Sequence, residues 1–138
     1  MKKTLVIIIL TVGLLNTAKA DTIDYWHVFY NETKIKEFNE NSKNMEITLK
    51  VKEIKKTDSL TIRYFRDVYY IDCEAKVEIE DSLKFVLAKG IGIGRGASLK
   101  ISVFDLLVTA RKSPFFAYYY DCATRDREKR LVFKVEFK

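Results

Sequence analysis

Histidine, tryptophan, proline, cysteine and glycine are all scarce in this chain of 138 residues. The single histidine, His27, excludes a multi-histidine metal cluster, and no serine or cysteine stands out as a nucleophile that it would activate. The two cysteines lack the Cys-x-x-Cys spacing of a redox dithiol. The sequence therefore marks no catalytic residue of these kinds, and we expect neither a metal nor a cofactor.

Glycine is confined almost entirely to one stretch. Of the five glycines, Gly13 lies near the N-terminus and the other four alternate through residues 90–96. Glycine allows a positive φ and the close approach of another group. In an extended chain these glycines would share one face, opposite two isoleucines and an arginine. Such a face accepts a ligand or a packed ring, or it bends the strand. The candidate binding residues in this strand or loop are Gly92, Gly94 and Arg95.

The N-terminus has the three parts of a secretory signal peptide. Lys2 and Lys3 precede a mostly apolar run, and residues 18–20 (AKA) supply small residues before a cleavage site. The apolar run is too short to span a bilayer comfortably. We therefore predict that residues 1–20 are a signal peptide and that no transmembrane segment remains after cleavage. Residues 21–138 are expected to form a single domain in the periplasm, at the cell surface or in the medium.

The charge balance is mild once this segment is removed. The full chain has 25 basic and 19 acidic side chains and a formal net charge of +6. Loss of Lys2, Lys3 and Lys19 lowers the net charge by three, to +3. So small a charge gives no reason to expect nucleic acid or an anionic membrane as a partner.

From residue 24 onward, apolar and polar residues alternate with period two, which is typical of half-buried strands. The expected strands lie at 25–30, 33–38, 45–51, 60–65, 74–80, 83–87, 99–101, 115–121 and 131–137. The strand at 45–51 is expected to be antiparallel to its neighbour. The final strand should bury Leu131, Phe133, Val135 and Phe137 on one face.

One segment, near residues 103–112, breaks this period and predicts a short helix. Ser102 is its expected N-cap, and Val103, Leu107 and Ala110 share a face. Pro114 follows the helix and prevents its continuation. The predicted fold class is therefore all-β, an antiparallel two-sheet β-sandwich with one short helix.

The two cysteines, Cys73 and Cys122, each follow an aromatic stretch and an aspartate. In an oxidising compartment an even count suggests one disulfide, which would close a loop of about 50 residues and stabilise the fold by roughly 4 kcal/mol. Two separate buried thiols are the alternative. If the bridge joins neighbouring strands, Asp72 and Asp121 could meet on the opposite face as an acid and base pair or as Ca²⁺ ligands. In the simpler reading each aspartate serves a turn.

Tyrosine is abundant, with eight residues, and three of them are consecutive. Consecutive tyrosines in a regular strand send rings to both faces. An exposed aromatic face suits a sugar or a protein partner, whereas the alternative is that aromatic residues are simply good strand formers. The candidate contacts are Tyr118, Tyr119, Tyr120 and, if it faces outward, Trp26.

Two segments, residues 21–30 (DTIDYWHVFY) and 59–67 (SLTIRYFRD), resemble a group of small exported proteins of Gram-negative bacteria that carry no assigned activity. The resemblance spans about the first half of the mature chain. It implies an exported β-rich domain and brings no catalytic residues with it.

Two functions from different classes remain. The first is a non-catalytic binding or interaction module for a protein or carbohydrate of the envelope or the exterior, with no nucleic acid partner. It would use an aromatic sheet face and the glycine-rich strand. The second is a small periplasmic hydrolase that uses Asp72 and Asp121 as its carboxylate pair.

Overall fold

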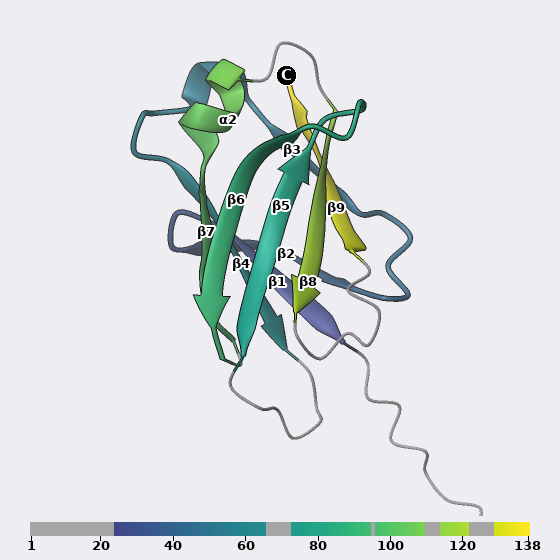
Figure 1. Cartoon of the computed structure of the whole chain (residues 1–138). Helices are drawn as coiled ribbons and strands as arrows, with labels where there is room; N and C mark the ends of the chain where they lie inside the picture. Colours follow the sequence, from purple (N-terminus) through teal and green to yellow (C-terminus); the bar gives the residue numbers. More distant parts are fainter. Residues whose placement is uncertain (1–23, 66–72, 95, 110–113, 122–128) are drawn as a thin grey trace, which may run out of the picture.

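The computed structural model describes residues 24–65, 73–94, 96–109, 114–121 and 129–138, and within them two β-sheets pack face to face with one short helix (Figure 1). The four-stranded sheet has the order β2–β1–β4–β7, and the five-stranded sheet has the order β3–β9–β8–β5–β6. The predicted two-sheet β-sandwich is confirmed. The four-stranded sheet contains β1 (Tyr25–Tyr30), β2 (Thr33–Asn39), β4 (Ser59–Phe65) and β7 (Leu99–Ser102). The five-stranded sheet contains β3 (Glu46–Leu49), β5 (Glu74–Glu80), β6 (Val86–Ile93), β8 (Phe115–Asp121) and β9 (Arg130–Phe137).

The core lies between the two sheets and consists of the alternate side chains that each strand turns inward. Tyr119 of β8 is buried in this core, with its ring centroid 4.5 Å from that of Tyr64 and 6.0 Å from that of Trp26. Phe38 and Phe133 stack across the sheets at 5.6 Å. Aromatic rings thus join the sheets through the core.

One pairing differs from the sequence prediction. The strand expected at 45–51 is shorter, and it runs parallel to β9 as the single parallel pair among the described strands. Its predecessor β2 belongs to the other sheet, so the chain crosses the sandwich between them. No hairpin therefore imposes an antiparallel direction on β3. A short 3₁₀ helix, η1 (Val51–Glu53), follows it.

The final strand departs from its expected alternation. Ala117 of β8 pairs with Phe133, but the next residue, Tyr118, pairs with Leu131, which leaves Val132 as an extra residue. This β-bulge reverses the alternation. Val132 and Phe133 are therefore both buried, whereas Leu131, which was expected in the core, is exposed.

The expected helix is present as α2 (Val103–Thr109). The Ser102 hydroxyl accepts a hydrogen bond from the amide of Asp105 at 3.1 Å, which confirms the predicted N-cap. Val103 and Leu106 are the buried residues, so the helix turns its i and i+3 positions to the core rather than the expected Leu107. The expected residues 110–112 lie outside the described part of the chain.

Two glycines allow the sheets to approach each other at β6 and β7. A Cβ atom on Gly90 would lie 3.1 Å from main-chain atoms of Leu99 and Lys100, and one on Gly92 would lie 2.8 Å from the Cβ of Ala97. The chain then turns from one sheet to the other through Gly94 and Gly96, which have φ values of 84° and 70°. The glycine face is thus directed inward and has a structural role.

We predict that Gly90→Ala lowers the free energy of unfolding by about 1–3 kcal/mol, because the new methyl group meets backbone that has no side chain to move aside. Ile91→Ala, on the exposed face of the same strand, is the matched control and should cost less. Urea unfolding of both variants tests this. Equal stability of Gly90→Ala and the wild type would contradict the close approach of β6 and β7.

Candidate functional site

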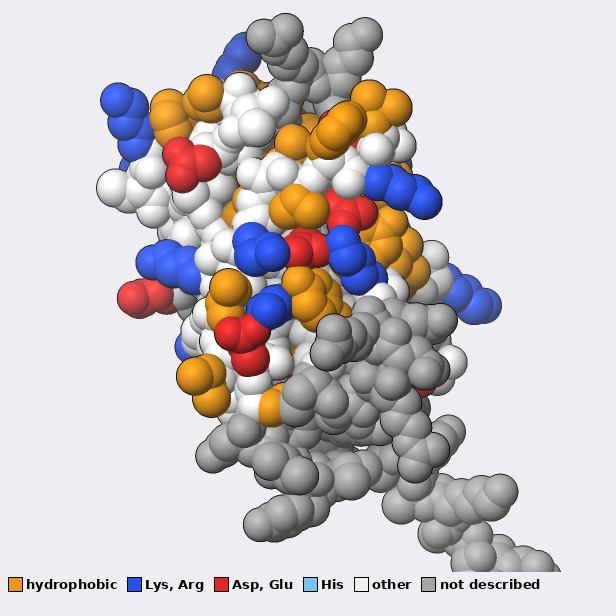
Figure 2. Space-filling model, in the orientation of Figure 1, with side chains coloured by type: hydrophobic (Ala, Val, Ile, Leu, Met, Phe, Trp, Pro, Cys, Tyr) orange, Lys and Arg blue, Asp and Glu red, His pale blue; other side chains and the backbone are white. Residues whose placement is uncertain are grey.

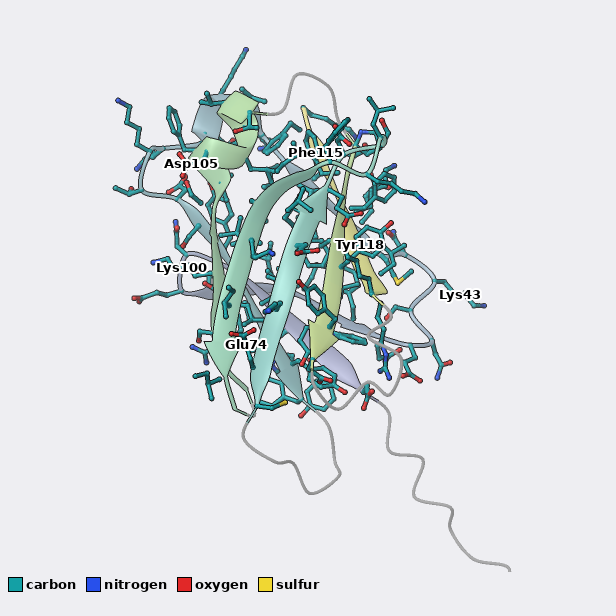
Figure 3. All side chains as sticks on the ribbon, viewed as in Figure 1. Lys43, Glu74, Lys100, Asp105, Phe115 and Tyr118 are labelled. Atoms are coloured by element: carbon teal, nitrogen blue, oxygen red, sulfur yellow. The ribbon has the colours of Figure 1, made fainter. Side chains whose placement is uncertain are left out.

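The candidate site is the outer face of the five-stranded sheet, made by side chains of β6, β5 and β8 that point away from the core. Figure 2 looks onto this face and shows hydrophobic side chains interleaved with basic and acidic ones. Figure 3 labels Glu74 and Tyr118 on two of its strands. The face therefore combines apolar and charged groups.

Exposed hydrophobic side chains gather along β6. Five of the nine large hydrophobic side chains that are exposed in the described part of the chain lie on β6 or in the hairpin before it. Ile93 is 74% exposed and Ile91 is 53% exposed, because the glycines that alternate with them take the inward positions. We call these five residues the β6 row: Leu83, Phe85, Val86, Ile91 and Ile93.

The hairpin that begins the β6 row is held by Asp81. Its carboxylate accepts hydrogen bonds from the amides of Leu83 at 2.8 Å and Phe85 at 2.9 Å. Lys84 between them has a φ of 66°. This turn delays the start of β6 to Val86, although a strand was expected from residue 83, and it leaves Leu83 and Phe85 exposed.

Beside the row, Glu78 of β5 is the centre of a charged network. Its side chain is only 6% exposed, and its carboxylate lies 2.7 Å from Lys89 Nζ and 2.6 Å from Lys129 Nζ. The Tyr120 hydroxyl donates a third bond to it at 2.8 Å. Lys129 also contacts Glu80, the next outward residue of β5. One carboxylate thereby connects β5 with β6, β8 and the start of β9.

The pKa values of these groups follow from the contacts. Burial alone would raise the pKa of Glu78, but the hydrogen bonds from Lys129, Lys89 and Tyr120 lower it to about 2. The bonds to Glu78 and Glu80 raise the pKa of Lys129. Burial and the bond to Glu78 raise the pKa of Tyr120. At neutral pH Glu78 is therefore ionised and is unsuited to act as a general acid.

The remaining charges of β5 are also paired. Lys76 forms an ion pair with Glu74, and its ammonium lies 5.9 Å from the centroid of the Tyr120 ring. The lysines of β5 and β6 and the glutamates of β5 thus neutralise one another across the face. The apolar β6 row lies beside a surface with little uncompensated charge.

The structure places the predicted aromatic contacts on opposite faces. Tyr118 and Tyr120 are half-buried on the outer face, but Tyr119 is 1% exposed and Trp26 is 3% exposed. Strand alternation turns both of these residues into the core. Burial thus removes Tyr119 and Trp26 from the candidate binding surface.

The predicted glycine contacts are not on this surface either. Gly92 faces Ala97, and Gly94 lies in the turn, where its amide donates a hydrogen bond to the carbonyl of Cys73 at 3.0 Å. Arg95 lies outside the described residues. Sequence reasoning missed Ile91 and Ile93 as contacts, although strand alternation makes them exposed once the glycines pack inward.

The predicted carboxylate and cysteine pairs each have one member among the described residues. Asp121 is buried and accepts a hydrogen bond from the Tyr119 hydroxyl at 2.9 Å, while Asp72 lies outside the described residues. Cys73 is not a free thiol, and Cys122 lies outside them too. Both pairs stay predictions. In the described part of the chain no three potential metal-ligating side chains come together.

A second aromatic group lies on the outer face of the four-stranded sheet. The rings of Tyr25 and Phe65 stack at 5.2 Å, and His27 lies 5.0 Å from Phe65. The Nε2 atom of His27 is 2.8 Å from the carboxylate of Glu37. These residues come from neighbouring strands, so their contacts are cross-strand pairs that stabilise the sheet.

Comparison of the chain with protein-family models, with curated proteins and with solved structures gives no match. The resemblance to small exported proteins therefore stays a prediction, and function must be argued from the surface itself. Within the described residues, no helix has the length and hydropathy that a membrane span requires.

We predict that Glu78→Gln destabilises the protein by about 1–3 kcal/mol at neutral pH, because it weakens two ion pairs and a tyrosine bond. The folded-state pKa of about 2 lies below the usual value of 4.5, so this stabilisation is present above pH 4.5 and is lost as the pH falls toward 2. The difference in unfolding free energy between wild type and variant should shrink over that range.

Urea unfolding at several pH values measures this difference. Glu32 is an exposed glutamate in the turn between β1 and β2, so Glu32→Gln is the control. It should change the free energy of unfolding little at any of these pH values. A difference between wild type and Glu78→Gln that is independent of pH would contradict the network.

Proposed function

We propose that this protein is a non-catalytic interaction module that binds another protein through the outer face of the five-stranded sheet. The observation that carries this proposal is the β6 row. Single exposed hydrophobic residues are ordinary on a protein surface, but a group of them along one element indicates a contact site. Here the group follows one strand and its hairpin, with Lys89 between Val86 and Ile91. The half-buried Tyr118 and Tyr120 lie on the same face, on the far side of β5.

The charge arrangement supports a protein partner over the other classes. Nucleic acid binding needs unpaired lysines and arginines, whereas Lys76, Lys89 and Lys129 are all held in ion pairs with glutamates. A carbohydrate partner favours exposed aromatic faces, but aliphatic side chains dominate here. An apolar row bordered by a neutral polar surface matches the core and rim of a protein interface.

The position of β6 in its sheet adds a second kind of contact. β6 is the last strand on one side of the five-stranded sheet, and no described strand pairs with its outer edge. An unpaired edge offers main-chain groups to an extended segment of a partner. A partner at this edge would also reach Ile91 and Ile93. The alternative, a hydrolase with Asp72 and Asp121, gains no support from Asp121, which is buried and bound by Tyr119.

We predict that Ile93→Lys weakens partner binding at least tenfold, because it puts a charge in the apolar contact. Val51→Lys makes the same chemical change at an exposed hydrophobic residue of η1 and should leave binding unchanged. A photo-crosslinking amino acid at position 91, compared with one at position 51, identifies the partner in cells. Calorimetric titration of that purified partner then compares the variants.

An adduct that forms from position 91 but not from position 51, with weaker binding of Ile93→Lys, supports the proposal. A crosslink to the chain itself would identify a second copy as the partner. The absence of an adduct from position 91, or equal affinities of Ile93→Lys and Val51→Lys for the purified partner, would rule out the β6 row as the contact.

We also propose that the module acts outside the cytoplasm with Cys73 and Cys122 bridged. The signal-peptide pattern of residues 1–20 supports export, and the absence of a free thiol at Cys73 supports the bridge. The expected intact mass is that of a chain beginning at Asp21 and lighter by two hydrogens until it is reduced. Mass spectrometry of the exported protein, with and without reductant, measures both features. An uncleaved cytoplasmic chain, or a mass unchanged by reduction, would contradict them.

A further inference from the structure

A groove of about 810 Å³ lies at the side of the sandwich away from β6 and β7. There the two outermost strands are β2 of the four-stranded sheet and β3 of the five-stranded sheet. Each contributes to the lining, together with residues of the turns before β2 and β4. The groove is thus bordered by two strands that end their sheets among the described residues.

The edge of β3 is the long wall of this groove. Five consecutive residues, 46–50, line it. Alternate side chains of a strand point to opposite faces, so a consecutive run can line a groove only along the main-chain edge. The free edge of β3 therefore faces the groove.

The hydrogen bonds of β3 show which groups that edge presents. The carbonyls of Met45 and Leu49 accept bonds from amides of β9 and its C-terminal end, and the Val51 amide donates to the carbonyl of Lys138. In a parallel pair, the amide and carbonyl of one residue point to the same neighbour, and those of the next residue point away from it. The main-chain groups of Glu46 and Thr48 and the amide of Lys50 consequently point into the groove, whereas the Lys50 carbonyl accepts a bond from the amide of Glu53 at 3.0 Å.

The opposite wall and one end are formed by a fixed polar network. The Asp58 carboxylate accepts bonds from the Tyr30 hydroxyl at 2.5 Å, the Asn31 side chain at 3.2 Å and the Lys55 amide at 2.8 Å. Burial and the bond to Asp58 raise the pKa of Tyr30 to about 12, so its hydroxyl stays protonated. Ile35 of β2 adds an apolar surface. The groove is therefore lined by groups whose positions are already set.

The uncompensated charge of the groove is positive. Glu53 pairs with Lys50 at 3.0 Å, and Glu46 lies 3.9 Å from Lys134. Asp58 is held by neutral donors and keeps its negative charge. Lys36 and Lys55 also line the groove, and no carboxylate of the described residues lies within ion-pair distance of either ammonium. Together with Asp58, these two lysines leave the groove with a net positive charge of one, which a ligand with negative charge complements.

We propose that this groove binds an extended acidic peptide segment, which adds as a strand to the free edge of β3 and places its carboxylates near Lys36 and Lys55. Main-chain bonds to Glu46, to Thr48 and to the amide of Lys50 would provide the pairing, and the two lysines would select acidic side chains. This site is separate from the outer face that carries the β6 row, so either can be disproved without the other.

The test begins with a displayed library of random ten-residue peptides selected on the purified full-length protein. We expect the enriched peptides to be rich in Asp and Glu. The best of them, made synthetically, is then titrated against variants by fluorescence anisotropy. Thr48→Pro should weaken its binding at least tenfold, because proline removes the amide that points into the groove and leaves the bonds to β9 in place. Thr48→Val keeps that amide and is the matched control.

A second pair of variants tests the charges independently of the edge. Lys36→Glu combined with Lys55→Glu should also weaken binding at least tenfold, whereas Lys52→Glu combined with Lys100→Glu makes the same change in net charge outside the groove. The melting temperature of each variant shows that it is folded. If Thr48→Pro does not fold, the binding of the charge-reversed variant relative to its control decides whether the groove is the peptide site.

Failure to enrich any peptide, enrichment of neutral or basic peptides, or equal binding by the charge-reversed and control variants would overturn the proposal. A protein dimer that Thr48→Pro dissociates would also overturn it, since the occupant would then be a second copy of the chain.

Discussion

The contact between β6 and β7, made possible by the missing side chains of Gly90 and Gly92, is the constraint on which the rest of this structure depends. It brings the outermost strands of the two sheets together on one side, whereas β2 and β3 border a groove on the other side. It also decides the orientation of β6: because the glycines take the inward positions, Ile91 and Ile93 must face solvent. The exposure of the β6 row therefore follows from this contact.

The network around Glu78 lies on the outer face of the five-stranded sheet, whereas the contact between β6 and β7 lies between the two sheets. Its three hydrogen-bonding partners come from β6, β8 and the residue before β9. Buried ion pairs contribute less to stability than their short distances suggest, because both charges lose water. An ion pair forms only when its two groups lie within a few ångströms of each other, however, so the network favours the one register of these strands that brings its members together. The apolar and tyrosine side chains of the face are held in fixed relative positions as a result.

The fold could be predicted from the sequence because strand alternation is a local property, and the strands from Tyr25 to Asn39 and the Ser102 cap match it closely. Features that depend on residues far away in the sequence could not be predicted from it. The direction of β3 depends on β9, and the bulge at Val132 depends on its pairing with β8. For the site, the alternation that exposes the isoleucines is visible in the sequence, but the inward orientation of the glycines depends on β7. The partners of Glu78 are up to 51 positions away and leave no local pattern.

The place of β9 has a consequence for how the chain assembles. β9 is the last of the described strands in sequence order, yet it lies inside the five-stranded sheet, between β3 and β8. β3, which comes early in the sequence, has β9 as its one neighbour among the described strands. β3 therefore cannot form its native pairing until β9, which lies nearly ninety residues later in the chain, has been synthesised. Among the described strands this pairing has the largest separation in sequence, and loss of β9 would leave β3 without its partner as well.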